Sequence, residues 1–414
     1  MISNTSQAFV WIWLPGHLDP VVAGKISFIA GKYHFVYGRT YLEREHSIPM
    51  SPIELPLEDE TFEPEGINEI HSCLRDAAPD AWGRRVIGYQ YSNLNPNELD
   101  YMLLSGSNRI GALDFQQSST DYKVRESSLP QLRDLLKAAQ LIAAGKPLPP
   151  ELDYTLLHGT SVGGARPKAL MSENRTQYIA KFSLSTDHYN IVKAEYVAMK
   201  LAKIAGIDVA DVQLEQSLGK DILLISRFDR IARNDFFERH LMLSGLSLLK
   251  LHEMEARYAS YQKLAELIRY QFSSPLNSLH ELFKRIVFNI LIGNTDDHAR
   301  NHAAFWDGTA LSLTPAYDIC PQARTGQIAS QAMNLEGKQG NHSTLVNALS
   351  ICHDYKREET EAKEIINTLI AVINDHWLKI CQDADRSKTE REHLWKNAVL
   401  NPYCFEGWQP KAWG

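Results

Sequence analysis

The sequence predicts an α+β fold, with a β-rich N-terminal part and a mainly helical C-terminal part. Residues 8–45 are rich in aromatic and β-branched side chains and are punctuated by Gly and Pro, which is typical of a small antiparallel sheet. Toward the C-terminus the apolar residues recur at helical spacing, and the longest helices are expected at 276–292, 360–381 and 386–400.

The N-terminal part is expected to contain helices as well as strands. A Pro-rich acidic loop over 51–66 is followed by two helical segments, 67–91 and 96–104. The string SNRIGALDF, residues 107–115, then reads as another strand.

A polar, Pro-rich stretch, KPLPPELD, indicates a domain boundary between residues 120 and 150. It follows an amphipathic helix expected over 130–144 and terminated by Gly145. A βαβ-like section comes next, with a strand at TQYIAKFSL, a helix from about 191 to 205 and two more strands. The expected domains are 1–120, 150–228 and 229–414.

Charge and cysteine usage narrow the class of protein. The net charge of -7 is spread without long blocks of one sign, so no footprint of direct nucleic-acid binding is visible. The five cysteines are scattered and lack a Cys-x-x-Cys spacing, which argues against a disulfide framework or a thiolate zinc site. The N-terminal residues lack the basic stretch of a signal peptide, and the sequence has no apolar run of about 18 residues. A cytoplasmic protein with reduced thiols and no membrane contact is expected.

The segment HGTSVGGARPKAL, residues 158–170, places two glycines and several small residues between two expected strands. Backbone N–H groups approach a phosphate closely only where no side chain intervenes, and such loops cradle polyphosphates. A plain hairpin could have the same composition, so this segment alone is weak evidence.

Lys181 lies in YIAKFS, an alternating run that is typical of a strand. An inward-facing lysine needs an anion, because an unpaired buried ammonium group is costly. Taken alone, Lys181 is better interpreted as a solvent-facing lysine on an edge strand. Glu195, on the helix expected after this strand, is a candidate partner, although it could equally be an ordinary surface glutamate.

The densest cluster of reactive side chains follows the helix expected at 276–292. Gly293 ends that helix, and seven residues of loop then hold Asp296, Asp297, His298, Asn301 and His302. A structural loop rarely needs so many short acceptors and imidazoles, which indicates function. One carboxylate could orient or deprotonate a substrate hydroxyl, and an amide five residues later could bind a magnesium ion that bridges phosphates.

Asp318 follows a short strand expected within LSLTPAYDICP. A carboxylate at a strand end is a plausible second metal ligand, and it could equally cap a helix. The chain thus has a Gly-rich loop, a strand lysine, a helix glutamate, an acidic loop with a downstream Asn, and a strand-end Asp. That is the order of these parts in protein kinases.

The amino-acid sequences of these segments resemble those of the HipA family of type II toxin kinases, although the motifs G-x-G-x-x-G, H-R-D and D-F-G of ordinary kinases are missing. The resemblance is carried by SVGGARPK, YIAKFS, NTDDHARNH and PAYDI, and in the N-terminal part by YLEREHSIPMSP, APDAWGRRV and RIGALDF. It covers nearly the whole chain. It implies a bilobal protein-kinase-like fold and a serine/threonine kinase that uses ATP and Mg²⁺.

Carried over residue by residue, the resemblance makes Asp296 the catalytic base and Asn301 and Asp318 the magnesium ligands. Lys181, oriented by Glu195, would hold the α- and β-phosphates. Further nucleotide contacts would come from three places. The Gly-rich loop would contribute Val162, Gly163, Gly164, Ala165, Arg166 and Lys168. The hinge strand, whose backbone receives adenine, would contribute Ser226, Arg227 and Phe228, and the acidic loop would contribute His298. Ser226 departs from the acidic residue that is common there. Asp297 receives no catalytic role.

The resemblance also implies regulation and partners. Family members can autophosphorylate a serine of the Gly-rich loop, here Ser161 with Thr160 as a neighbouring candidate, which ejects the loop and switches the enzyme off. The implied targets are translation factors, notably an aminoacyl-tRNA synthetase such as the glutamyl enzyme. A helix-turn-helix antitoxin would neutralise the kinase and connect it to DNA only indirectly.

Two other functions stay open on the residues alone. His298 and His302 stand four apart, as zinc-binding histidines do on a helix, so the Asp/His cluster at 296–302 could serve a metal-dependent hydrolase. That motif wants a Glu after the first His, and Ala299 stands there instead. A kinase-shaped binding module without catalysis is the other alternative. The joint presence of Lys181, Asp296, Asn301 and Asp318 argues against it.

Overall fold

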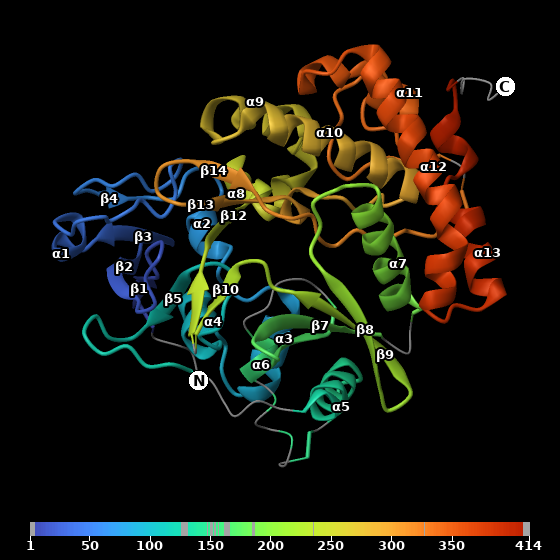
Figure 1. Ribbon diagram of the computed structural model, residues 1–414. Coiled ribbons are helices and arrows are strands. Elements are labelled where there is room, and N and C mark those ends of the chain that lie inside the picture. Colours follow the sequence, from blue (N-terminus) through green and yellow to red (C-terminus); the bar gives the residue numbers. More distant parts are fainter. Residues whose placement is uncertain are drawn as a thin grey trace. The chain divides into compact units, whose positions relative to one another are not determined.

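The computed structural model describes residues 5–125, 131–146, 148–149, 152, 155, 157–160, 166–183, 187–234, 236–326 and 328–408 (Figure 1). The chain forms two compact units. The first consists of Met1–Thr186, Glu215–Leu243 and Phe305–Thr309, and the second of Asp187–Leu214, Ser244–Ala304 and Ala310–Gly414.

A five-stranded antiparallel sheet, in the order β4-β3-β2-β1-β5, confirms the sheet predicted for the N-terminal part. Its strands are β1 (Gln7–Ile12), β2 (Val21–Ile29), β3 (Lys32–Tyr37), β4 (Thr61–Phe62) and β5 (Leu113–Gln116). Alternate residues of β3 are buried, as in a strand with one face on the core. At Gly24 a Cβ would lie 2.3 Å from the Val36 carbonyl oxygen, so a larger residue would break the β2–β3 pairing.

The helices of the first unit are short. They are α1 (Arg39–Leu42), α2 (Ser72–Arg75), α3 (Ala81–Gln90), α4 (Glu98–Leu104), α5 (Leu132–Ala143) and α6 (Leu157–Thr160). The single helix expected over 67–91 is wrong, because the chain breaks between α2 and α3, where Pro79 lacks the N–H that a helix interior needs. Helix α4 begins at Asn97, which forms a capping box with Asp100.

A four-stranded sheet in the order β6-β7-β9-β8 follows, made of β6 (Lys168–Glu173), β7 (Thr176–Phe182), β8 (Val212–Ser217) and β9 (Lys220–Ser226). Strand β7 pairs antiparallel with both β6 and β9. Apolar side chains of α3 and α5 pack in one core with alternate residues of the central strands, Tyr178, Ala180, Phe182, Ile222 and Leu224. The residues between these in sequence therefore belong to the opposite face of the sheet.

The remaining strands form two small sheets. Strands β10 (Arg230–Arg233) and β11 (Phe236–Arg239) pair as a hairpin. Strands β12 (Leu241–Ser244), β13 (Ala303–Trp306) and β14 (Leu311–Leu313) pair in that order.

The second unit is mainly helical, as predicted. Its helices are α7 (Ile191–Ile204), α8 (Gly245–Leu248), α9 (Tyr261–Gln271), α10 (Pro275–Ile292), α11 (Leu345–Ser350), α12 (Glu359–Asp383) and α13 (Lys388–Asn397). Within the described residues of this unit, four 3₁₀ helices connect them, η2 (Glu253–Tyr258), η3 (Ala299–Asn301), η4 (Cys352–Tyr355) and η5 (Pro402–Phe405). The long helix α12 lies beside α7 and α13 (Figure 1). The three long helices predicted from periodicity are confirmed as α10, α12 and α13.

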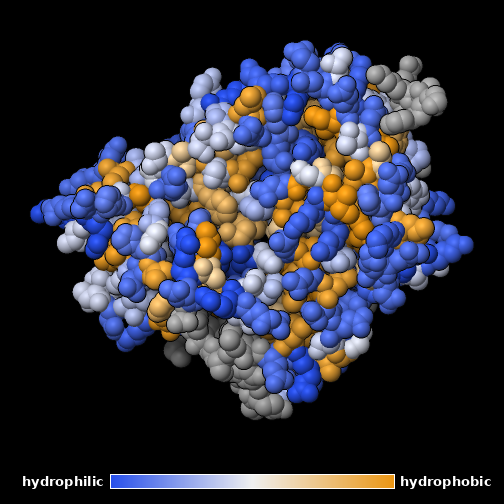
Figure 2. Space-filling model, in the orientation of Figure 1, coloured by the Kyte–Doolittle hydropathy of each residue, from blue (hydrophilic) through white to orange (hydrophobic). Residues whose placement is uncertain are grey.

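The buried, reduced cysteines expected from the sequence are confirmed. All five cysteines are buried with free thiols. On the face shown in Figure 2, hydrophilic side chains alternate with apolar ones. Among the residues that the structure describes, no helix combines the length and the apolar character needed to cross a membrane.

Candidate active site

In the first unit, Lys168 and Lys181 are direct register partners on β6 and β7. Residues directly opposite in an antiparallel pair project to the same face, with Cβ atoms roughly 5 Å apart. Both lysines are buried, and β7 is an interior strand, so the interpretation of Lys181 as a solvent-facing residue on an edge strand is wrong. Two adjacent lysines on one face of a sheet are residues that could bind a polyphosphate.

The Gly-rich loop falls largely outside the described residues. Ser161, Val162, Gly163, Gly164 and Ala165, all expected to contribute to the site, belong to this part of the chain. On its C-terminal side Arg166 is half-buried. On its N-terminal side Thr160 is fully buried, and its Oγ1 accepts a hydrogen bond from the Gly106 N–H at 3.0 Å.

The expected hinge begins where β9 ends at Ser226. The Arg227 N–H donates to the Gln177 carbonyl oxygen at 2.8 Å. The Arg227 guanidinium is buried and donates to both carboxylate oxygens of Asp229, at 2.9 and 2.7 Å, and to Asn108 Oδ1 at 2.8 Å. The side chain of Arg227 thus holds the hinge, and its N–H is engaged by Gln177, which leaves the Arg227 carbonyl oxygen and the neighbouring backbone for the expected contact with adenine. Phe228, the third hinge residue, is half-buried.

Asp229 makes this hinge a buried ionic cluster. Burial alone would raise the pKa of Asp229, but the positive charges of Arg227 and Arg230 outweigh it and hold the pKa well below its usual range. The Asp229 carboxylate also accepts from the Gly111 N–H at 2.8 Å. The RIGALDF segment is therefore tied to the hinge by charge-assisted hydrogen bonds.

In the second unit, α10 delivers the acidic loop that the sequence singled out. Gly293 ends α10 in the left-handed region, with φ of 76°. A Cβ at this position would lie 2.5 Å from the Ala398 carbonyl oxygen, so glycine is required by both backbone conformation and space. The loop then runs from Asn294 into η3.

Asp297 is the buried centre of this loop. Its Oδ2 accepts hydrogen bonds from Tyr261 Oη, from Asn289 Nδ2 at 2.8 Å and from His302 Nε2 at 2.9 Å. Burial acts to raise the pKa of Asp297, but the charge and hydrogen bond of His302 and the hydrogen bond of Tyr261 lower it overall. The family resemblance assigns Asp297 no role, whereas the structure makes it the residue that joins the loop and His302 to α9 and α10.

Asp296, in contrast, is exposed. Partial desolvation and the negative charges of Asp318 and Asp297 raise its pKa, against the opposing effect of His298. Asn301 is buried, and its Nδ2 donates to the Asp296 carbonyl oxygen at 3.2 Å. The fold of the second unit therefore brings Asp296, Asn301 and Asp318 into one neighbourhood.

Asp318 occupies a constrained turn. Its φ of 61° lies in the left-handed region, which costs a non-glycine residue roughly 1–2 kcal/mol and which Asp and Asn tolerate best. Hydrogen bonds fix the chain before this turn, from the Ala316 N–H to Asp208 O at 2.7 Å, and after it, from the Gln322 N–H to Gly293 O at 2.9 Å. Strained backbone of this kind clusters at functional sites.

The donor set fits magnesium. Carboxylate and amide oxygens are the ligands that this ion prefers, and Mg²⁺ is commonly held by one or two carboxylates together with substrate phosphates. Desolvation is the main cause of the raised pKa of Asp296, and the negative charge of Asp318 adds to it. A divalent cation would neutralise such neighbouring carboxylates. Within the described part of the chain, no three His, Cys, Asp or Glu side chains gather as a ready-made metal site.

Glu195 lies on α7 and is buried, so its interpretation as a surface glutamate is wrong. Helix α7 starts at Asn190, whose side chain accepts from the Lys193 N–H at 3.0 Å. It is fastened within the second unit by Lys193 Nζ, which donates to Asp385 O at 2.9 Å, and by Arg386, which donates to Asn190 O at 3.0 Å. Lys181 belongs to the first unit, so the pairing of Glu195 with Lys181 stays a prediction.

The histidine geometry that a hydrolase would need does not form. His298 and His302 flank η3, a single 3₁₀ turn rather than an α-helix. His302 is buried and bonds to Asp297. The two rings therefore do not share a helix face as a zinc-binding pair would.

Comparison with family models gives two matches along the chain. The HipA N-terminal domain matches residues 14–116, and the HipA-like C-terminal domain matches residues 160–377. The second match alone spans more than half of the chain.

Curated relatives and a solved structure agree with these matches. The serine/threonine-protein kinase toxin HipA of Shewanella oneidensis is 24% identical over 335 residues, which is 73% of each chain. A putative kinase of Sinorhizobium fredii, Y4mE, is 24% identical over 70% of this chain and 72% of its own. The solved complex of Shewanella oneidensis HipA, HipB and operator DNA contains a chain with the same fold, with a TM-score of 0.65 at 17% identity, covering 96% of this chain and 97% of that one.

Proposed function

This chain belongs to the HipA family and is a serine/threonine-protein kinase, and we propose that it transfers the γ-phosphate of ATP to a serine of a protein that acts in translation. The observation that supports this most strongly is the meeting of Asp296, Asn301 and Asp318 on one loop and one strained turn of the second unit. An aminoacyl-tRNA synthetase such as the glutamyl enzyme is the proposed substrate.

The kinase family implies ATP, and we assign the contacts to residues of both units. Lys168 and Lys181 would bind the phosphates, Glu195 would orient Lys181, and the backbone of the hinge at 226–228 would receive adenine. Asn301 and Asp318 would hold Mg²⁺, with His298 nearby. When bound, this ion supplies charge neutralisation of the phosphates.

Asp296 is the residue we assign to the acceptor hydroxyl. Its carboxylate is exposed, so a protein substrate can reach it, while Asn301 and Asp297 fix the backbone on which it stands. Positioning of this kind accounts for much of the acceleration in phosphoryl transfer.

We further propose that Ser161 is the residue of autophosphorylation. Its neighbour Thr160 is fully buried and accepts a hydrogen bond from Gly106, so phosphorylation of Thr160 would require the segment to leave its place. Phosphopeptide mass spectrometry of protein incubated with ATP should find the modification on Ser161. Its appearance on Thr160 with Ser161 unmodified would contradict the assignment.

The proposed partner is a helix-turn-helix antitoxin that neutralises the kinase and carries it to operator DNA. The support is the assembly of Shewanella oneidensis HipA with HipB and DNA. We also propose that the chain is organised in the three domains expected from its sequence, 1–120, 150–228 and 229–414.

Transfer of label from [γ-³²P]ATP tests the assignment of Asp296. Asp296→Asn should lower the transfer rate by roughly 10²-fold or more, because the group that aligns the acceptor hydroxyl is lost. Asp375→Asn, on the exposed face of α12, is the matched control and should keep the wild-type rate. Equal rates for the two variants would overturn the proposed role.

A further inference from the structure

Two N-terminal motifs carry no role in the function proposed so far. They are APDAWGRRV, which forms the start of α3, and the segment at Gly106–Gly111 that precedes β5. Both lie in the first unit together with the segments that flank the Gly-rich loop. The contacts that the two motifs make with the flanking segments indicate the function of the motifs.

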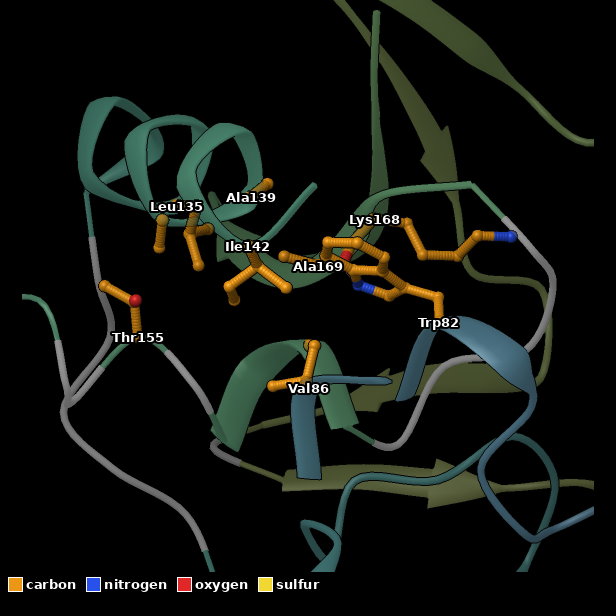
Figure 3. A pocket seen from close by; sticks show the side chains of 10 residues that line it. Trp82, Val86, Leu135, Ala139, Ile142, Thr155, Lys168 and Ala169 are labelled. Carbon is orange, nitrogen blue, oxygen red and sulfur yellow. The ribbon is translucent and has the colours of Figure 1, made fainter. Parts of the chain in front are cut away.

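Trp82 of α3 holds the C-terminal side of the loop. Its Nε1 donates to the Lys168 carbonyl oxygen at 2.9 Å, across 86 residues of sequence, and its side chain is buried. Figure 3 shows the indole lying against the start of β6, while the Lys168 side chain extends away from the pocket. The free volume of this pocket is about 20 Å³, enough for roughly one water molecule and far too small for a nucleotide.

Gly83, the next residue, allows α3 to approach the N-terminal side of the loop. A Cβ at Gly83 would lie 2.4 Å from the Thr160 carbonyl oxygen, a distance that real Cβ atoms do not reach. The Thr160 hydroxyl is held in addition by the Gly106 N–H. One turn of α3, with Gly106, thus fixes the residues on both sides of 161–167.

We propose that α3 positions Thr160 and Lys168, the described residues on either side of the Gly-rich loop, and that Trp82 and Gly83 thereby set the affinity for ATP without touching it. The inference rests on the proposed function, in that it takes Lys168 to bind the phosphates. Residues whose backbone is already held in place lose less conformational entropy when a ligand binds, so the anchors contribute to binding.

The competing interpretation is that Trp82 is simply a core residue. It belongs to the apolar cluster under the four-stranded sheet, and truncating any member of that cluster would lower stability. The test must therefore separate ATP affinity from stability, which matched substitutions make possible.

Helix α3 supplies its own control for Gly83. Gly83→Ala should raise the Kd for ATP, measured by calorimetry with Mg²⁺ present, by about tenfold, because the added Cβ displaces the Thr160 backbone. Gly88→Ala lies on the exposed side of the same helix with nothing within 4 Å, and should leave the Kd unchanged. Equal Kd values for the two variants would overturn the proposal.

Trp82→Phe keeps the test decisive if Gly83→Ala does not fold. It removes one buried hydrogen bond and should raise the Kd for ATP roughly fivefold, the equivalent of about 1 kcal/mol. Trp13→Phe removes an equivalent bond, from Trp13 Nε1 to Leu18 O at 3.0 Å, at a similarly buried site. It should lower the melting temperature comparably while leaving the Kd unchanged. At saturating ATP, phosphate transfer by Trp82→Phe should return to the wild-type rate.

The results distinguish this inference from the proposed function. Wild-type protein that fails to bind ATP would refute the function itself. Wild-type protein that binds ATP, with Trp82→Phe and Trp13→Phe showing the same Kd, would refute only the role of α3.

Discussion

Asp297 shows how a single buried side chain can place an active-site loop. Three donors from α9, α10 and the end of the loop converge on its Oδ2, so the loop backbone is defined before any ligand binds. Such a network is strong only while all of its members are satisfied. Its consequence is that Asp296 and Asn301, on either side, are held at fixed positions.

Tyr261→Phe tests this network by removing one donor with little change in shape. The free energy of unfolding should fall by about 2 kcal/mol, since hydrogen bonds to charged groups contribute on the order of 1.5–3 kcal/mol. Tyr270→Phe, on the exposed side of the same helix, should change it by less than about 0.5 kcal/mol. Urea titration of both variants measures the difference in the free energy of unfolding. Equal values for the two variants would contradict the role of Asp297 as the residue that holds the loop.

The residue types alone marked this loop as reactive, and only the family resemblance distinguished Asp296 from Asp297, without a physical reason. Asp296 and Asp297 are adjacent and chemically identical, and only the tertiary partners make one exposed and the other buried. The one signal in the sequence was Asn289, a polar residue within the apolar stripe of the helix. A buried amide requires a partner, so Asn289 could have indicated a polar group beyond the end of α10, an inference that the sequence analysis did not draw.

At the level of elements, the hinge after β9 is connected to the N-terminal part by the buried cluster of Arg227, Asp229 and Arg230. The three charges satisfy one another and the backbone at 108–111. A buried pair of this kind costs much when one member is removed, because the other is left as an uncompensated charge.

Arg227→Met should therefore destabilise the protein by about 3–5 kcal/mol. Arg233→Met, in the neighbouring β10–β11 hairpin, breaks an ion pair with Glu238 in which the arginine is well exposed, and should cost less than about 1 kcal/mol. Thermal unfolding of the two variants gives the comparison. A loss of stability no larger in Arg227→Met than in Arg233→Met would show that the cluster does not hold the hinge.

Helices were predicted correctly where the apolar spacing extends over several turns, and incorrectly where a proline interrupts that spacing. Helices α10 and α12 each carry several turns of apolar spacing, and both formed as predicted. The segment 67–91 also has helical spacing, but Pro79 interrupts it. Lys181 was harder to place, because strand order, which makes β7 an interior strand, depends on pairings that a single sequence does not contain.

For the whole molecule, the α+β class followed from composition and periodicity, whereas the kinase-like architecture came from the resemblance. The order of motifs along the chain indicated which residues should meet. Only the fold reveals that N-terminal residues hold the flanks of the Gly-rich loop and the hinge. The N-terminal part is thus an integral support of the nucleotide-binding segments of the first unit.

We propose that Lys181, Asn301 and Asp318 act on one nucleotide. A crystal structure with a non-hydrolysable ATP analogue and Mg²⁺ tests it most directly. The account predicts Lys181 Nζ within hydrogen-bonding distance of the α- or β-phosphate and a metal ion bound by Asn301 and Asp318. A nucleotide bound elsewhere, or a metal held by His298 and His302, would contradict it.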